Sequence, residues 1–262
     1  MNKKIIWVDV GTHQAQEYNS VFGKNSWFIY RIFRMLISTI LLRRKAFIGF
    51  KKIYSLILTR RKIRGAQSEF RVAFIEANPS HICEKIYKLA SDIFCIALGD
   101  KSKSSFSINR LYHKNQDKNS QGNTIYLKTP GISLSNFTLC PIVSADSFAE
   151  SYKKFLDTTY EDYEIILRIN CEGSEDAVIY AFSKHFGEKF KVILGSLKDV
   201  RVIKGLDKFE KLENHLLLNN ITLTSFSSEV DSWVKAHEVL SLIHISEPTR
   251  LLSISYAVFC LK

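Results

Sequence analysis

Polar and acidic residues follow three apolar segments of the sequence, at the point where each segment ends. The segments span residues 5–8, 70–75 and 163–169. Short apolar runs that end in turn residues are typical of buried parallel strands. Because the carboxyl ends of parallel strands meet at one edge of a sheet, we expect the polar residues that follow them to face one ligand-binding crevice.

The first segment ends in Asp9, Gly11 and Thr12. A strand that stops at a glycine and turns into a helix directs backbone N–H groups at a ligand, and the carboxylate adds hydrogen-bond acceptors. No GxGxxG follows this strand, which disfavours a nicotinamide-dependent oxidoreductase because that pattern cradles the pyrophosphate of the dinucleotide. An Asp-x-Gly that serves only the turn is the alternative.

The second segment ends in Glu76, followed by Asn78 and by Pro79, which begins a predicted helix. In α/β folds that bind nucleotides, an acid at the end of the second strand holds ribose hydroxyls. A glutamate that stabilises the N-terminus of the next helix is the alternative. Its position makes Glu76 a candidate for ribose binding.

The third segment ends in an acidic turn that contains Asn170, Glu172 and Glu175, and an amphipathic helix follows. Polar groups at the end of a central strand face the same crevice as the first two motifs. Glu172 and Glu175 are candidate general bases, and His13 ranks below them. The alternative is a capping arrangement in which Ser174 and the neighbouring acids bind the N-terminus of the next helix.

The order of these motifs resembles the FkbM family of S-adenosylmethionine-dependent O-methyltransferases. The match includes Ala97-Leu98-Gly99-Asp100 and covers roughly residues 5–17 and 70–239. The resemblance implies S-adenosylmethionine as the cofactor and a hydroxyl as the methyl acceptor. The implied cofactor-binding residues are Asp9, Gly11, Thr12, Glu76, Asn78 and Ala97. The implied catalytic residues, in the turn near the acceptor, are Glu172, Glu175 and Asn170.

Members of this family often act on sugars or polyketide-type products, so the resemblance implies a hydroxyl of a sugar or glycan as the acceptor. The membrane contact that the basic insertion predicts adds a lipid-linked glycan precursor as a candidate. The sequence departs from the family pattern at three positions, where Ala15 replaces a glycine, Arg168 a lysine and Asn170 an aspartate. An asparagine can hydrogen-bond a hydroxyl, but it cannot take a proton at neutral pH. A non-catalytic, membrane-associated scaffold with a methyltransferase fold is therefore the alternative hypothesis.

The succession of apolar strands and helices predicts one α/β domain over residues 1–239. With the resemblance, we expect a Rossmann-like class I methyltransferase fold, with a mostly parallel seven-stranded sheet and helices on both faces. Residues 101–142 are expected to form a hairpin and loops over the substrate side, and residues 220–226 an edge strand. Five scattered cysteines without metal-binding spacing predict free thiols, a cytoplasmic protein and no metal site.

Twelve of the 37 Lys and Arg residues lie between Tyr18 and Ser68, a stretch without Asp or Glu. The rest of the chain, with 25 basic and 26 acidic residues, is nearly neutral, so the net charge of +11 does not indicate a nucleic-acid-binding protein. We expect residues 20–66 to form a basic insertion with two amphipathic helices joined by a basic turn. Apolar faces flanked by cations predict peripheral contact with an anionic membrane surface, at the inner face of the membrane. A helical lid packed on the domain is the alternative.

Residues 240–262 resemble an in-frame translation of a short-read sequencing adapter, with three residues between its two constant parts, where a variable index would be. A genuine apolar strand is the alternative. We expect this segment not to be native protein, and the fold prediction therefore ends at residue 239.

Overall fold

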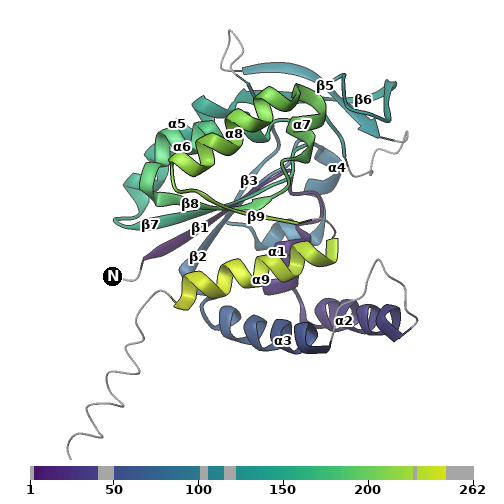
Figure 1. Ribbon diagram of the computed structural model, residues 1–262, viewed down its shortest axis with the longest axis vertical. Helices are drawn as coiled ribbons and strands as arrows, with labels where there is room; N and C mark the ends of the chain where they lie inside the picture. The colour runs from purple at the N-terminus through teal and green to yellow at the C-terminus, as the bar shows by residue number, and fades with distance from the viewer. Residues whose placement is uncertain (1–2, 41–49, 101–105, 115–121, 227–228, 246–262) are drawn as a thin grey trace, which may run out of the picture.

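The central sheet has six parallel strands, with helices on both of its faces (Figure 1). The computed structural model describes residues 3–40, 50–100, 106–114, 122–226 and 229–245. The strands of this sheet are β1 (Lys4–Val10), β2 (Phe70–Ile75), β3 (Asp92–Phe94), β7 (Tyr163–Ile169), β8 (Phe190–Gly195) and β9 (Thr222–Ser225). Their order is β3-β2-β1-β7-β8-β9, the order of a doubly wound Rossmann-like sheet. The predicted α/β class and edge strand are confirmed.

A second, smaller sheet has three strands in the order β4-β6-β5. They are β4 (Ala97–Gly99), β5 (Phe106–Lys114) and β6 (Ile132–Ser144). β5 and β6 form the hairpin expected between residues 101 and 142. The described part of the chain thus has six strands in the central sheet where seven were predicted, and the short apolar run of β4 pairs with β6 instead of extending that sheet.

Helices from two parts of the chain cover the two faces of the central sheet (Figure 1). One face is covered by α5 (Ala145–Thr159), α6 (Glu175–Phe186), α7 (Lys198–Lys204) and α8 (Leu206–Leu218). The other is covered by α1 (Gln16–Phe22) and α9 (Glu229–Ile245), while α3 (Phe50–Gly65) packs on these two helices and reaches the same core through Ile63. The remaining helices are α2 (Asn25–Ile40) and α4 (Pro79–Ile82).

The sequence of β1 shows why its residues form a central strand. Ile6 and Val8 pack into the core under α5 and α6, whereas Ile5 and Trp7 pack into the core under α1 and α9. Because both faces of a parallel sheet are covered, such a strand is apolar throughout instead of alternating. Asp9, which is fully buried, is the exception. It lies near the carboxyl end of the strand.

The predicted helical insertion is present as α2 and α3, the layer of the molecule farthest from the sheet (Figure 1). The two helices pack on α9 through Phe28, Ile53 and Trp233. The predicted basic turn, at residues 43–45, lies outside the described residues. None of the described helices is both long enough and apolar enough to cross a membrane.

α9 extends to Ile245 and includes the first residues of the segment that resembles an adapter translation. Leu240 is fully buried in the core between α9 and the sheet. Residues 246–262 of that segment lie outside the described residues.

Arg60 links α3 to the end of α1 by hydrogen bonds. Its Nε donates a hydrogen bond to the Ser20 carbonyl oxygen at 2.9 Å, and its two terminal nitrogens donate to the Gly23 carbonyl and to Asn25 Oδ1. The guanidinium also stacks on the ring of Phe28, 4.3 Å from its centroid. A buried cation with these acceptors fixes the insertion to the domain.

Replacing Arg60 by alanine should lower the free energy of unfolding by about 1–3 kcal/mol, because buried carbonyl oxygens lose a charged donor. Arg61 is the next residue of the same helix and is exposed, so Arg61→Ala should change stability by less than about 0.5 kcal/mol. Urea unfolding of both variants measures the difference. Equal effects of the two changes would contradict this role of Arg60.

Candidate functional site

A cavity of about 210 Å³ lies at the carboxyl ends of β1, β2 and β7. The strand order reverses between β1 and β7, which makes this edge the switch point where open α/β sheets bind ligands. The cavity wall consists of residues 10–14, 75–77 and 170–172, and residues 122–125 close it on the side of the β5–β6 hairpin. The loops after the three strands therefore share one crevice, as the sequence predicts.

Gly11 allows the turn after β1 to pass directly against the turn after β7. Its φ angle is +72°, a conformation that residues with a Cβ rarely adopt. A Cβ at this position would lie 2.1 Å from the carbonyl oxygen of Asn170. The Asn170 N–H donates to the Val10 carbonyl oxygen at 3.0 Å, which holds the two turns together. Only glycine fits here.

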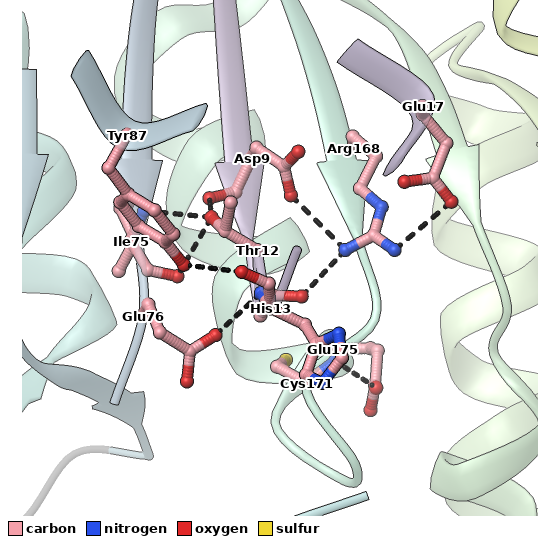
Figure 2. Close-up of polar contacts among 11 residues, drawn as sticks. Asp9, Thr12, His13, Glu17, Ile75, Glu76, Tyr87, Arg168, Cys171 and Glu175 are labelled. Atoms are coloured by element: carbon pink, nitrogen blue, oxygen red, sulfur yellow. Dashed lines mark hydrogen bonds and ion pairs between the residues drawn. The ribbon is translucent and has the colours of Figure 1, made fainter. Parts of the chain in front are cut away.

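Asp9 and Arg168 are direct partners in the register of β1 and β7, so their side chains project from the same face of the sheet. Arg168 Nη1 donates to Asp9 Oδ1 at 3.1 Å and to the Gly11 carbonyl oxygen at 2.7 Å. Its Nη2 donates to Glu17 Oε1 at 3.2 Å, from α1 above this face (Figure 2). One guanidinium thus bridges two buried carboxylates and the turn after β1.

Burial shifts the pKa values of Asp9 and Arg168. Burial raises the pKa of Asp9 to about 7, and the Arg168 guanidinium opposes the rise. Although burial lowers the pKa of Arg168, the Glu17 and Asp9 carboxylates outweigh it and raise that pKa above its usual value. Arg168 therefore stays charged, and Asp9 gains a proton more readily than a carboxyl group in water.

Glu76 lies on the cavity wall and binds two backbone N–H groups. Its Oε2 accepts from His13 at 2.7 Å and its Oε1 accepts from Asn78 at 2.8 Å. Burial raises the pKa of Glu76, and these two N–H groups oppose the rise. Because each carboxylate oxygen has a second lone-pair site, Glu76 can accept a further hydrogen bond on each oxygen from a ligand.

Thr12 joins the ends of β1 and β2, although it also lines the cavity. Its Oγ1 donates to the Asp9 carbonyl oxygen at 2.8 Å and accepts the Ile75 N–H at 3.2 Å. The side chain is fully buried. Its hydroxyl therefore positions the loop.

Asn78 and Ala97, both predicted to bind the cofactor, have different positions. Asn78 is buried behind the wall, where its Oδ1 accepts the Ser80 N–H at 3.1 Å and caps α4. Ala97, the first residue of β4, lies on the wall beside Ile96 and Leu98. Asp9 also lies behind the wall and reaches the cavity through Arg168.

The three predicted catalytic residues separate into two groups. Asn170 and Glu172 line the cavity. Glu175 does not, because its carboxylate accepts the N–H groups of Cys171 at 3.0 Å and Gly173 at 2.8 Å (Figure 2). Glu175 therefore stabilises the turn before α6. Ser174, the N-cap residue of α6, makes no side-chain capping hydrogen bond, so the alternative in which Ser174 caps this helix is not what the structure shows.

Glu172 lies on the cavity wall. Its backbone has a φ angle of +53°, and the Thr124 hydroxyl donates to its carbonyl oxygen at 2.9 Å. Burial, followed by the Asp199 carboxylate, raises the pKa of Glu172, and Lys114 opposes the rise. The side chain is thus a carboxylate that accepts a proton more readily than an exposed glutamate.

His81 and Tyr87 belong to the site, and sequence reasoning missed both. The His81 ring packs edge-on against His13, with 4.3 Å between the ring centroids, and the Tyr87 hydroxyl donates to the His13 carbonyl oxygen at 2.8 Å (Figure 2). These residues are far apart in the sequence and meet because β1 pairs with β2. No local spacing signals such a contact.

Comparisons with protein-family models, with curated proteins and with solved structures found no match to this chain. Among the residues that the structure describes, no group of three or more His, Cys, Asp or Glu side chains is arranged to hold a metal ion. The function of the chain is therefore inferred from the geometry and charge of the cavity.

Arg168→Met removes the guanidinium from two buried carboxylates, so we expect the free energy of unfolding at neutral pH to fall by about 3–5 kcal/mol. Without the cation that opposes it, burial should raise the pKa of Asp9 further. The folded variant then holds a proton that the unfolded chain releases, so its stability falls as pH rises between the two pKa values. The loss should be smallest near about pH 5 and largest near about pH 8.

Urea unfolding of the parent and of Arg168→Met across this pH range measures the effect. Arg201→Met is the matched control, because Arg201 is exposed on α7 and should change stability by less than about 0.5 kcal/mol. A loss that is the same at every pH would contradict the ion-pair interpretation.

Proposed function

We propose that this chain is an S-adenosylmethionine-dependent O-methyltransferase. The observation that carries the proposal is an excess of negative charge around a cavity at the switch point of the sheet. Among the described residues that line the cavity, Glu17, Glu76 and Glu172 are acidic and Arg168 is the one Lys or Arg. S-adenosylmethionine has a sulfonium and an ammonium group against one carboxylate, so it is a net cation and suits this wall.

A nicotinamide dinucleotide suits the cavity poorly. Its pyrophosphate needs backbone N–H groups after the first strand. Here the N–H groups of Gly11 and Thr12 point to the Ile75 carbonyl oxygen, at 2.9 and 3.4 Å, and the N–H of His13 donates to Glu76. Three carboxylates would also repel the phosphates.

The wall offers partners for the ribose, the adenine ring and the ammonium group of the proposed cofactor. Glu76 can accept hydrogen bonds from two ribose hydroxyls. Ile96, Leu98 and Ile125 supply an apolar surface suited to the adenine ring. Glu17 offers a carboxylate to the ammonium group. Asp9 is a positioning residue, because it acts on the cavity through Arg168.

S-adenosylmethionine, when bound, supplies an activated methyl group for in-line displacement by an oxygen nucleophile. Positioning then provides much of the rate. We assign to Glu172 the removal of the proton from the acceptor hydroxyl as the oxygen–carbon bond forms. Asn170, beside it on the wall, can hydrogen-bond that hydroxyl but cannot take its proton. The acceptor class is a small molecule or glycan, including a lipid-linked precursor.

Calorimetric titration of the full chain should show saturable binding of S-adenosylmethionine and none of NAD. Glu76→Ala should weaken the binding about 10- to 100-fold, because a charged hydrogen-bond acceptor is worth about 1.5–3 kcal/mol. Glu210→Ala, an exposed change on α8, is the matched control and should leave the dissociation constant unchanged. Circular dichroism checks that each variant is folded. Binding of NAD alone, or full affinity in Glu76→Ala, would overturn the cofactor assignment.

Glu172→Gln should lower kcat about 10²- to 10⁴-fold, the range for loss of a general base, and weaken the binding of S-adenosylmethionine much less than Glu76→Ala does. In the parent, the rate should fall as pH drops below the raised pKa of Glu172, because a protonated carboxyl cannot act as a base. Release of S-adenosylhomocysteine with a panel of sugars, nucleotide sugars and polyprenyl-linked sugars measures both effects.

Two results of this assay would count against the assignments. Equal kcat in Glu172→Gln and the parent would exclude Glu172 as the base. Cofactor binding without turnover on any acceptor would favour the non-catalytic scaffold that Asn170 suggests.

A further inference from the structure

α2 and α3 expose large apolar side chains to solvent. On α2 these are Ile29, Tyr30, Phe33 and Ile37. On α3 they are Tyr54, Ile57 and Leu58. Each of the seven is between 40% and 65% exposed, and together they are called the α2–α3 apolar face. Large exposed apolar side chains gathered on two helices that share a core indicate a binding partner.

The side chains of α2 form three stripes around the helix. Phe28 and Ile32 are buried against α3 and α9. Ile29, Phe33 and Ile37 follow at a spacing of four residues, which places them on one exposed stripe next to the buried one. Arg34, beyond that stripe, is exposed. This order, from buried to exposed apolar to cationic, is typical of a helix that lies in a membrane interface.

The charges that α2 and α3 themselves carry have one sign. Arg34 on α2 and both Arg61 and Lys62 on α3 are exposed. No Asp or Glu occurs between Glu17 and Glu69 in the sequence, so neither helix carries a carboxylate. A partner of this surface must therefore be apolar and anionic at once.

We propose that the α2–α3 apolar face docks on an anionic lipid membrane. A lipid surface is both apolar and anionic, since acyl chains accept the apolar side chains while anionic headgroups pair with the flanking cations. A second copy of the chain would bring cations against cations. The long Arg and Lys side chains can reach the headgroups while their stems lie along the apolar surface.

The position of the two helices in the fold suits this role. α2 and α3 lie beyond α1 and α9, on the side of the molecule opposite α5, α6 and α8 (Figure 1). A flat surface can therefore approach both helices without meeting the sheet or the hairpin. The absence of a spanning helix among the described helices is consistent with docking at the surface.

Flotation of the full chain with large unilamellar vesicles tests the proposal. One set of vesicles is phosphatidylcholine alone, and the other contains about 30% phosphatidylserine, which gives a negative surface. We expect binding to the anionic vesicles to be at least about tenfold stronger than to the neutral ones, and to weaken as salt is raised.

Two variants separate the apolar and the charged parts of the face. Phe33→Ser with Leu58→Ser should lower partitioning at least about tenfold, because two large apolar side chains no longer enter the membrane. Arg34→Gln with Arg61→Gln and Lys62→Gln should lower it about fivefold for each cation removed. All five positions are exposed, so the fold should be retained.

Matched changes on the opposite side of the sheet are the controls. Leu217 and Leu218 on α8 are 76% and 83% exposed, so their replacement by serine removes equal apolar surface elsewhere. Lys208→Gln with Lys211→Gln removes exposed cations of the same helix. Neither control should change binding to anionic vesicles by more than about twofold if α8 lies away from the membrane.

Three results would overturn the proposal. The first is that the chain does not bind anionic vesicles, and the second is that the α8 controls lose as much binding as the variants of the face. The third is a dimer in sedimentation that Phe33→Ser with Leu58→Ser abolishes, which would assign the face to a second copy of the chain. The proposal does not depend on the methyltransferase assignment, because vesicle binding needs no cofactor. The affinity for S-adenosylmethionine, measured on the same variants, should stay unchanged. This measurement therefore distinguishes a failure of the docking proposal from a failure of the methyltransferase proposal.

Discussion

The functional site depends on the parallel pairing of β1 with β7. This register places Asp9 opposite Arg168 and brings the turn at Gly11 against the carbonyl oxygen of Asn170. A shift of one residue would turn Arg168 to the other face of the sheet, into the apolar core under α5 and α6. The positions of Asn170 and of Glu172, two residues farther on, follow from this pairing more than from the sequence of their own turn.

The same pairing has an electrostatic cost. Asp9 and Glu17 share one guanidinium in a buried setting, and a buried ion pair contributes little net stability because its charges lose their hydration. A fold that needed only stability would place apolar residues here. Carboxylates gathered at the switch point are therefore better explained by a ligand, and a cationic ligand would relieve the excess charge.

The sequence predicted the strands with continuous apolar runs, because burial on both faces leaves a strong local signal in β1, β2 and β7. It also placed the hairpin and the edge strand correctly. It did not predict which side chains of a turn face the cavity, because that depends on the backbone angles of the turn and on the strands that surround it. Glu172 and Glu175 have the same side chain in the same turn, yet only the fold shows that Glu172 lines the cavity while Glu175 binds Cys171 and Gly173. Similarly, the Asn78 side chain caps α4, although the family resemblance had implied a contact with the cofactor.

α1 links the insertion to the cavity. Glu17, near its beginning, lines the cavity and binds Arg168, and Ser20, one turn later, binds Arg60 of α3. A ligand or surface can shift a protein between two states only through contacts that differ between those states. Since α1 is held at both ends by buried guanidinium groups, docking of α2 and α3 would leave the cavity as it is. If the proposed methyltransferase function and the proposed docking both hold, the insertion acts by keeping the protein where a lipid-linked acceptor is concentrated, and not by switching its site.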